Sequence, residues 1–143
     1  MRRSLYKTVF VILVIVFIGI QYIELDRTNP PVKADLEAPR EIKNLLKKAC
    51  YDCHSYETTW PWYSKVAPVS WLVSDDVEEA RKHLNFSDWE NLPRSKKEDL
   101  KKNIWEELVA DDMPPKKYIY LHPDASLEMI QKNILKRWLQ NND

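Results

Sequence analysis

A single glycine among 143 residues restricts the folds that this chain can adopt. That residue, Gly19, lies in an apolar N-terminal segment, so the chain beyond it contains no glycine. Loops that cradle phosphate groups need glycine for close approach of the backbone, so sites of the dinucleotide and P-loop type are excluded. Turns must be built by the nine prolines and by Asn and Asp.

The N-terminal segment is apolar enough to cross a membrane. Residues 8–23 are apolar except for Thr8, Gln21 and Tyr22, and with their apolar neighbours they approach the roughly 20 residues that span a bilayer. A cleaved signal peptide is the alternative, because its apolar region is shorter. No small-x-small cleavage site follows Ile20, so we expect residues 1–26 to form an uncleaved signal anchor.

The distribution of charged residues indicates how this anchor is oriented in the membrane and whether the chain can bind nucleic acid. Arg2, Arg3 and Lys7 precede the segment, and the positive-inside rule places that end in the cytoplasm and everything after Asp26 outside. The first acidic residue is Glu24, so the chain after Lys7 carries 19 basic and 22 acidic groups. That balance argues against nucleic acid as a partner.

Beyond the anchor, the sequence predicts an all-helical domain. Residues 27–38 contain Pro30 and Pro31 and predict an extended tether, and residues 39–143 predict the folded domain. Pro39 can open a helix, whose apolar stripe follows at i, i+3, i+4 and i+7 as Ile42, Leu45, Leu46 and Ala49. A further helix is predicted at residues 75–84, and the capping-box pairs Ser87/Glu90 and Ser95/Glu98 each predict the start of another. The last predicted helix starts near Ser126, and its apolar stripe is Leu127, Ile130, Ile134 and Trp138. No alternating run is long enough to compete with these helices as a strand, although residues 118–121 are compatible with an extended backbone.

The only two cysteines lie in the motif Cys50-Tyr51-Asp52-Cys53-His54. This CxxCH spacing is typical of covalent c-type haem attachment, in which two thiols add to the vinyl groups and the adjacent histidine binds iron. A structural disulfide is one alternative, and a thioredoxin-like redox pair is another, although the latter needs a βαβ context. A zinc site would need a fourth ligand, and no second cysteine pair supplies it.

A longer stretch carries a family resemblance: CYDCHSYETTWPWYSKVAPVSWLVSDDVEEARKHLNFSDW. Its motifs CxxCHS, WPWY, APVSW, Asp-Val followed by Arg, and LNFSxW, with a later MPP and LHPDA, resemble the bacterial haem-binding domain family of single-haem, membrane-anchored or exported proteins. The resemblance covers residues 41–138. Ala80 stands where the family is expected to have glycine. Alanine favours a helix more than glycine does, so this difference raises no doubt about function.

The resemblance implies one haem c in a small cytochrome c-like helical domain that follows an N-terminal transmembrane helix. Covalent haem attachment in bacteria takes place on the outer face of the inner membrane. We therefore expect a single-pass inner-membrane protein with its C-terminal domain in the periplasm. The family implies haem binding, and it implies neither a known redox partner protein nor a reaction.

Met113 is the predicted second axial ligand of the iron. It lies in Asp-Asp-Met-Pro-Pro, where the prolines stiffen the loop, and a thioether held beside haem is what a Met-ligated cytochrome c uses. His122 is the second choice. Met129 lies opposite the apolar stripe of its helix and His83 lies off the apolar face of its own, so both are predicted to be exposed.

The aromatic cluster after the cysteines predicts the walls of a haem pocket. Trp60, Trp62, Tyr63 and Trp71 can supply apolar surface, and one of Trp60, Trp62 and Tyr63 is expected to donate its N–H or O–H group to a haem propionate. Core packing is the alternative role for each of them. A proline carbonyl is a common acceptor for the second nitrogen of a haem histidine, and Pro68 is the predicted acceptor, with Pro61 as an alternative.

Two axial ligands would leave no iron position open for a substrate, so the sequence predicts an electron carrier that serves an unidentified redox partner protein. A haem sensor, or a module that binds a small ligand at an open or displaceable site, is the alternative. A peroxidase-like enzyme would need an open iron site with an acid–base residue beside it. The only His–Arg pair in view is Arg81 and His83, which are two residues apart and do not share a helical face, so an enzyme is not expected.

Overall fold

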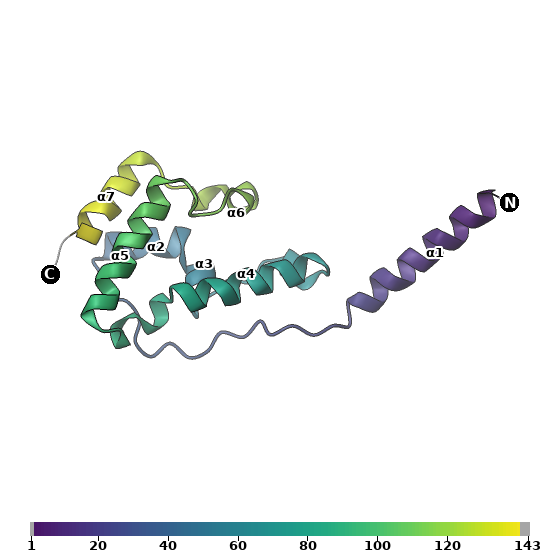
Figure 1. Cartoon of the computed structure of the whole chain (residues 1–143), viewed down its shortest axis with the longest axis horizontal. Coiled ribbons are helices and arrows are strands. Elements are labelled where there is room, and N and C mark those ends of the chain that lie inside the picture. The colour runs from purple at the N-terminus through teal and green to yellow at the C-terminus, as the bar shows by residue number, and fades with distance from the viewer. Residues whose placement is uncertain (1, 141–143) are drawn as a thin grey trace.

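The computed structural model describes residues 2–140, which are helical apart from their connections and contain no strand (Figure 1). This confirms the all-α prediction. In chain order the elements are α1 (Arg2–Ile20), α2 (Arg40–Ala49), α3 (Tyr51–His54), the 3-10 helix η1 (Trp62–Lys65), α4 (Val69–His83), the 3-10 helix η2 (Phe86–Asn91), α5 (Arg94–Val109), α6 (Lys116–Leu121), the 3-10 helix η3 (Pro123–Ala125) and α7 (Met129–Gln140).

Helix α1 projects away from the rest of the chain (Figure 1). Its window Arg3–Ile20 has a mean hydropathy of 2.0, and none of that window is buried against the protein. By length and composition this helix can cross a membrane, as the sequence predicted.

The apolar core is built by α2, η2, α5 and α7, with α7 packed against both α2 and α5. All four members of the predicted α2 stripe are buried. The ring of Tyr51, just beyond α2, stacks on Phe86 of η2 with 5.2 Å between centroids. The largest side chains with almost no exposure are Phe86, Leu46, Leu108 and Leu135.

Helix α7 differs from its prediction. It begins at Met129 rather than near Ser126, and its buried side chains are Leu135 and Leu139, whereas Ile130 is 66% exposed. The other three residues of the predicted stripe do face the core, because Leu127 is buried in the loop before the helix and Ile134 and Trp138 are partly buried against the core.

Three other local predictions also differ. Helix α4 begins at Val69 instead of residue 75, and residues 118–121 form the end of α6 rather than an extended segment. Prolines immediately precede both helices, Pro68 at α4 and Pro115 at α6, and a proline is well suited to a helix start. The capping box expected at Ser95 is replaced by Pro93, and Glu98 pairs with Arg94.

Residues 21–36, which we call the strap, leave α1 through a turn at Gln21 and Tyr22 and then run along the domain as a segment without helix or strand (Figure 1). The segment predicted as a tether is thus extended, and it is also bound to the domain along its length. The strap begins with the side chain of Gln21, which donates to the Ala67 carbonyl at 3.1 Å and accepts from the Ala67 amide at 2.9 Å. It ends with Leu36, which is 2% exposed within the core and donates its amide to the Phe86 carbonyl at 2.9 Å.

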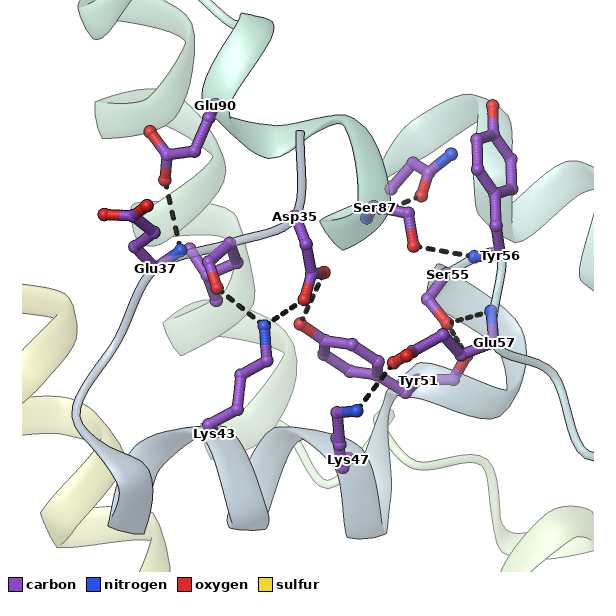
Figure 2. A network of polar contacts seen from close by, with 12 residues as sticks. Asp35, Glu37, Lys43, Lys47, Tyr51, Ser55, Tyr56, Glu57, Ser87 and Glu90 are labelled. Carbon is purple, nitrogen blue, oxygen red and sulfur yellow. Dashed lines mark hydrogen bonds and ion pairs between the residues drawn. The ribbon is translucent and has the colours of Figure 1, made fainter. Parts of the chain in front are cut away.

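The end of the strap is also tied to α2 and to the cysteine motif by polar contacts (Figure 2). Asp35 pairs with Lys43 and accepts a hydrogen bond from the Tyr51 hydroxyl at 3.1 Å. Lys43 donates as well to the Leu36 carbonyl at 2.6 Å. The strap therefore positions the first residue of α3, Tyr51, as part of the same packed unit.

Candidate functional site

The CxxCH motif forms a tight helical turn. Cys50 ends α2 and precedes α3, and its carbonyl accepts from the amides of Cys53 at 3.2 Å and His54 at 2.9 Å. The following Ser55 is fully buried; its hydroxyl donates to the Tyr51 carbonyl at 2.7 Å and accepts from the Glu57 amide at 2.9 Å (Figure 2). The turn thus fixes the two cysteines and the histidine relative to each other.

His54 is held by the last turns of α4. Its Nδ1 lies 3.1 Å from the Ala80 carbonyl oxygen and 3.1 Å from that of Leu84. Because both neighbours accept only, Nδ1 carries the proton and the lone pair resides on Nε2. Burial lowers the pKa of the imidazole, which keeps it neutral. A neutral ring with its Nε2 lone pair free is the form that binds a metal.

The predicted acceptor for this ring, the Pro68 carbonyl, is replaced by the carbonyls of Ala80 and Leu84. Pro68 instead precedes the first residue of α4. The His54 ring meets the other end of that helix, where the Ala80 carbonyl also accepts from the Leu84 amide at 2.9 Å and Leu84 is the first residue beyond the helix. Pro68 therefore does not have the orienting role in this structure.

Cys50 and Cys53 are partly buried and both thiols are free. Burial, followed by the nearby Cys53, raises the pKa of the Cys50 thiol to about 12. Burial, with the carboxylates of Asp52 and Asp76, raises that of Cys53 to about 11. Both thiols are therefore protonated at neutral pH, whereas the reactive cysteine of a thiol–disulfide redox protein has a lowered pKa.

Helix α6 closes over the motif through a chain of aromatic and polar contacts. The Tyr118 hydroxyl donates to Asp52 Oδ2 at 2.6 Å, and the Tyr118 ring stacks on His122 at 4.4 Å between centroids. His122 Nε2 lies in turn 2.7 Å from the Tyr63 hydroxyl of η1. These contacts join α3, α6 and η1 at the side of the motif that bears Cys53.

Helix α4 is joined to the same cluster by charge. Lys117 of α6 pairs with Asp76 of α4 at 2.7 Å, and α3 packs against α4. Two of the predicted site residues, Tyr63 and His122, contact each other in this cluster beside the motif.

Met113 lies in the loop between α5 and α6. It is 37% exposed and lines a cavity of about 210 Å³ together with Pro114, Ile119 and Leu127. That lining includes neither cysteine of the motif and not His54. Met129 and His83 are exposed as predicted, Met129 by 70%, and His83 pairs with Glu79.

Arg81 is a functional candidate whose role the sequence did not reveal. From α4 it donates to the Ser55 carbonyl at 2.8 Å, directly after the motif, and to the Thr58 hydroxyl at 3.0 Å. It also donates to the strap, at the Thr28 carbonyl at 3.2 Å and Asn29 Oδ1 at 2.9 Å. Its presence after Asp-Val in the family pattern was the only available signal.

A family model described as a haem-binding domain matches residues 15–141 of the chain. The chain belongs to the haem-binding domain family. Comparison with curated proteins and with solved structures finds no match. The matched residues include the CxxCH turn, the strap and every helix from α2 to α7. The whole domain therefore belongs to the family, and its ligand is haem.

The haem-binding domain also holds donors that suit the carboxylates of a haem. The indole nitrogens of Trp60 and Trp71 are buried and have no hydrogen-bond partner among residues 2–140. A buried donor without an acceptor is costly, and a propionate would satisfy either one. Trp62 differs from this pair, because it is 77% exposed and packs edge-on against Tyr63.

Within residues 2–140, no group of three or more His, Cys, Asp and Glu side chains is arranged to hold a metal ion. A closed structural zinc site needs four such ligands. The Nε2 atom of His54 and the two unpaired indoles are instead groups that a bound haem can use, as an iron ligand and as donors to its carboxylates.

Proposed function

We propose that this protein carries one haem c, attached by thioether bonds to Cys50 and Cys53, with His54 as one axial ligand of the iron. The observation that carries the proposal is the double contact of His54 Nδ1 with the Ala80 and Leu84 carbonyls. It fixes the tautomer, orients the ring and leaves Nε2 for the metal.

The other residues of the site have supporting roles in this proposal. The tight turn of α3 holds both thiols on one short segment, where each can add to a vinyl group. The Trp60 and Trp71 indoles donate to propionates, and Tyr63 supplies an aromatic wall. Arg81 locks the loop after the motif against the strap, which limits movement of His54.

We further propose that the protein is a membrane-anchored electron carrier, with α1 in the bacterial inner membrane and the haem domain in the periplasm. When bound, the haem supplies a one-electron ferric–ferrous couple. Met113 is the proposed second ligand, because its thioether lies in a loop stiffened by prolines. With both axial positions filled, the proposal assigns no catalytic activity, and the partner is an unidentified redox protein.

One observation favours the second candidate, a haem sensor or small-ligand module. Met113 lines a cavity whose lining excludes the CxxCH residues, whereas His122 lies in the cluster beside Cys53 and hydrogen-bonds Tyr63. An iron site without Met113 would be open or would be filled by a ligand that a small gas displaces.

Visible absorption of the full-length protein tests both candidates. We expect a low-spin ferric spectrum with the far-red band of methionine bound to iron, no change with carbon monoxide, and loss of the band in Met113→Ala. Met129→Ala is the matched control, because Met129 is an exposed methionine of α7. A wild type that binds carbon monoxide, unchanged by Met113→Ala and altered by His122→Ala, would overturn Met113 as the ligand.

The attachment itself is tested by denaturing electrophoresis with haem staining. Haem that stays with wild type and is lost from Cys50→Ala/Cys53→Ala is the expected result. A wild type without covalently bound haem, expressed with a working attachment system, would contradict the proposal for the cofactor.

A further inference from the structure

The end of the domain formed by η1 and the start of α4 lies against the end of α1. Gln21, one residue beyond α1, makes two hydrogen bonds to the backbone of Ala67, in the loop between η1 and α4. Figure 1 shows the same end of α4 next to the point where α1 leaves the domain. Any bilayer crossed by α1 would therefore have its outer surface at this end of the domain.

This end of the domain exposes apolar side chains. Four of them, which we call the apolar tip, are Trp62, Val66, Val69 and Leu72, exposed by 77%, 37%, 43% and 66%. Residues 58–74 contain no acidic residue, and Lys65 is their single charged one. Tryptophan beside aliphatic side chains and lysine is the composition that lies in the headgroup region of a membrane.

The strap limits how far the tip can move from the anchor. Arg27 donates to the Ser64 carbonyl of η1 at 3.3 Å, and Ser74 of α4 donates to the Asp26 carbonyl at 3.1 Å. With the Gln21 contacts, these bonds fix the strap to both sides of the tip. Since residues 20–36 contain no glycine, the strap has no residue of high backbone freedom to act as a hinge.

We propose that the apolar tip lies in the outer interface of the bilayer that α1 crosses, with Trp62 and Leu72 at the level of the upper acyl chains and Lys65 at the lipid phosphates. The inference rests on the membrane anchoring given under the proposed function. Its occupant is lipid, because the tip is continuous with the anchor and hydrogen-bonded to the residue that follows it.

This placement also brings the site close to the membrane. Tyr63 follows Trp62 in η1 and contacts His122 in the cluster beside Cys53. The domain would thus stand with the η1 end on the bilayer and with α5 and α7 away from it, as they lie at the opposite end in Figure 1.

The test is photo-crosslinking of the full-length protein in nanodiscs of phosphatidylethanolamine and phosphatidylglycerol. The photoreactive residue p-benzoylphenylalanine replaces Leu72, Ile130 or Phe17, one at a time. Leu72 and Ile130 are both 66% exposed, on α4 and α7, so they are a matched pair, and Phe17 of α1 reports anchoring itself. Lipid adducts are then counted by mass spectrometry.

We expect lipid adducts at positions 17 and 72, with at least about tenfold fewer at position 130. An adduct at position 17 but none at position 72 would overturn the inference while leaving the anchor intact. Adducts to a second copy of the chain at position 72, or equal lipid adducts at positions 72 and 130, would also overturn it. No lipid adduct at position 17 would refute the anchoring, and with it the placement of the tip.

Discussion

The two sides of the domain are held together in different ways. The side built by α2, η2, α5 and α7 is closed by large apolar side chains such as Leu46, Phe86 and Leu135. On the cysteine side, built by η1, α4 and α6, α6 has no buried residue and the 15-residue α4 buries only Ser70 and Val77.

Polar groups take the place of a core on the cysteine side. Ser55, Thr58 and Ser64 are buried there, and two indole nitrogens lack acceptors. An amphipathic helix normally gains its stability by burying an apolar face. The two unpaired indole nitrogens on this side fit the haem that the family binds, because its propionates supply acceptor atoms.

The largest expected effect comes from removing the covalent attachment. In Cys50→Ala/Cys53→Ala we expect loss of all covalently held haem and faster amide exchange in α4 and α6. Exchange in α5 and α7 should stay close to that of wild type, because these helices pack mainly on each other and, through α7, on α2. Exchange by mass spectrometry checks this, and uniform loss of protection over all four helices would refute the distinction between the two sides.

Truncation in the apolar core is expected to have the next largest effect. Leu46 is fully buried, so Leu46→Ala should lower the free energy of unfolding by about 3 kcal/mol, through lost transfer energy and the cavity left behind. Leu121→Ala on α6 is the control, because Leu121 is 53% exposed, and it should cost less than about 0.5 kcal/mol. Urea denaturation of both variants in detergent measures the difference, and equal costs would contradict the comparison.

A smaller effect is expected at Arg81, which links the cysteine side to the strap. Arg81→Ala should cost about 2 kcal/mol, since it leaves the Ser55 and Thr28 carbonyls without this donor. Arg81→Lys should recover little of the loss, because lysine lacks the planar fork of donors. The exchange of the strap amides checks the mechanism. Recovery of wild-type exchange by lysine would show that only the charge matters.

The smallest expected effect is a dependence of the strap on pH. Asp26 Oδ1 accepts from the Thr28 amide at 2.9 Å, and this bond, with a second one to the Thr28 hydroxyl, lowers the pKa of the carboxyl. A lowered pKa in the folded state gives a stabilising contribution that is present above the unfolded pKa of about 3.9 and is lost as pH falls through the folded value.

Asp26→Asn keeps the acceptor and removes the titration. Strap exchange in the variant should therefore vary less with pH below about 4 than in wild type. A carboxyl titration by NMR should give a pKa for Asp26 below the ordinary value, and an ordinary or raised value would contradict the prediction.

Elements whose stability depends on their own side-chain pattern were predictable. The stripe of α2 has the helical period, and all four of its residues are buried as the period requires. At α7 the same reasoning placed Leu127, Ile134 and Trp138 correctly against the core but also included Ile130, which is 66% exposed, and it missed the buried Leu135 and Leu139.

The site was predictable only where side chains carry the chemistry. Cys50, Cys53 and His54 are recognisable because thiols and an imidazole at this spacing have a specific use. The acceptors of the His54 ring are backbone carbonyls, and any residue could supply them. The contact of Tyr63 with His122 joins residues 59 positions apart, and a single sequence has no signal for such a pairing.

The hydrogen bonds of Gln21 to Ala67 also bear on the kinetics of the proposed electron transfer at a membrane. A redox centre on a long free linker samples a hemisphere of solution and meets soluble partners by three-dimensional diffusion. A centre joined rigidly to a membrane helix moves laterally at constant height, so its encounter rate depends on how many molecules share each area of membrane. Electron exchange by such a protein would then rise with its surface density and be insensitive to the volume of the compartment around it.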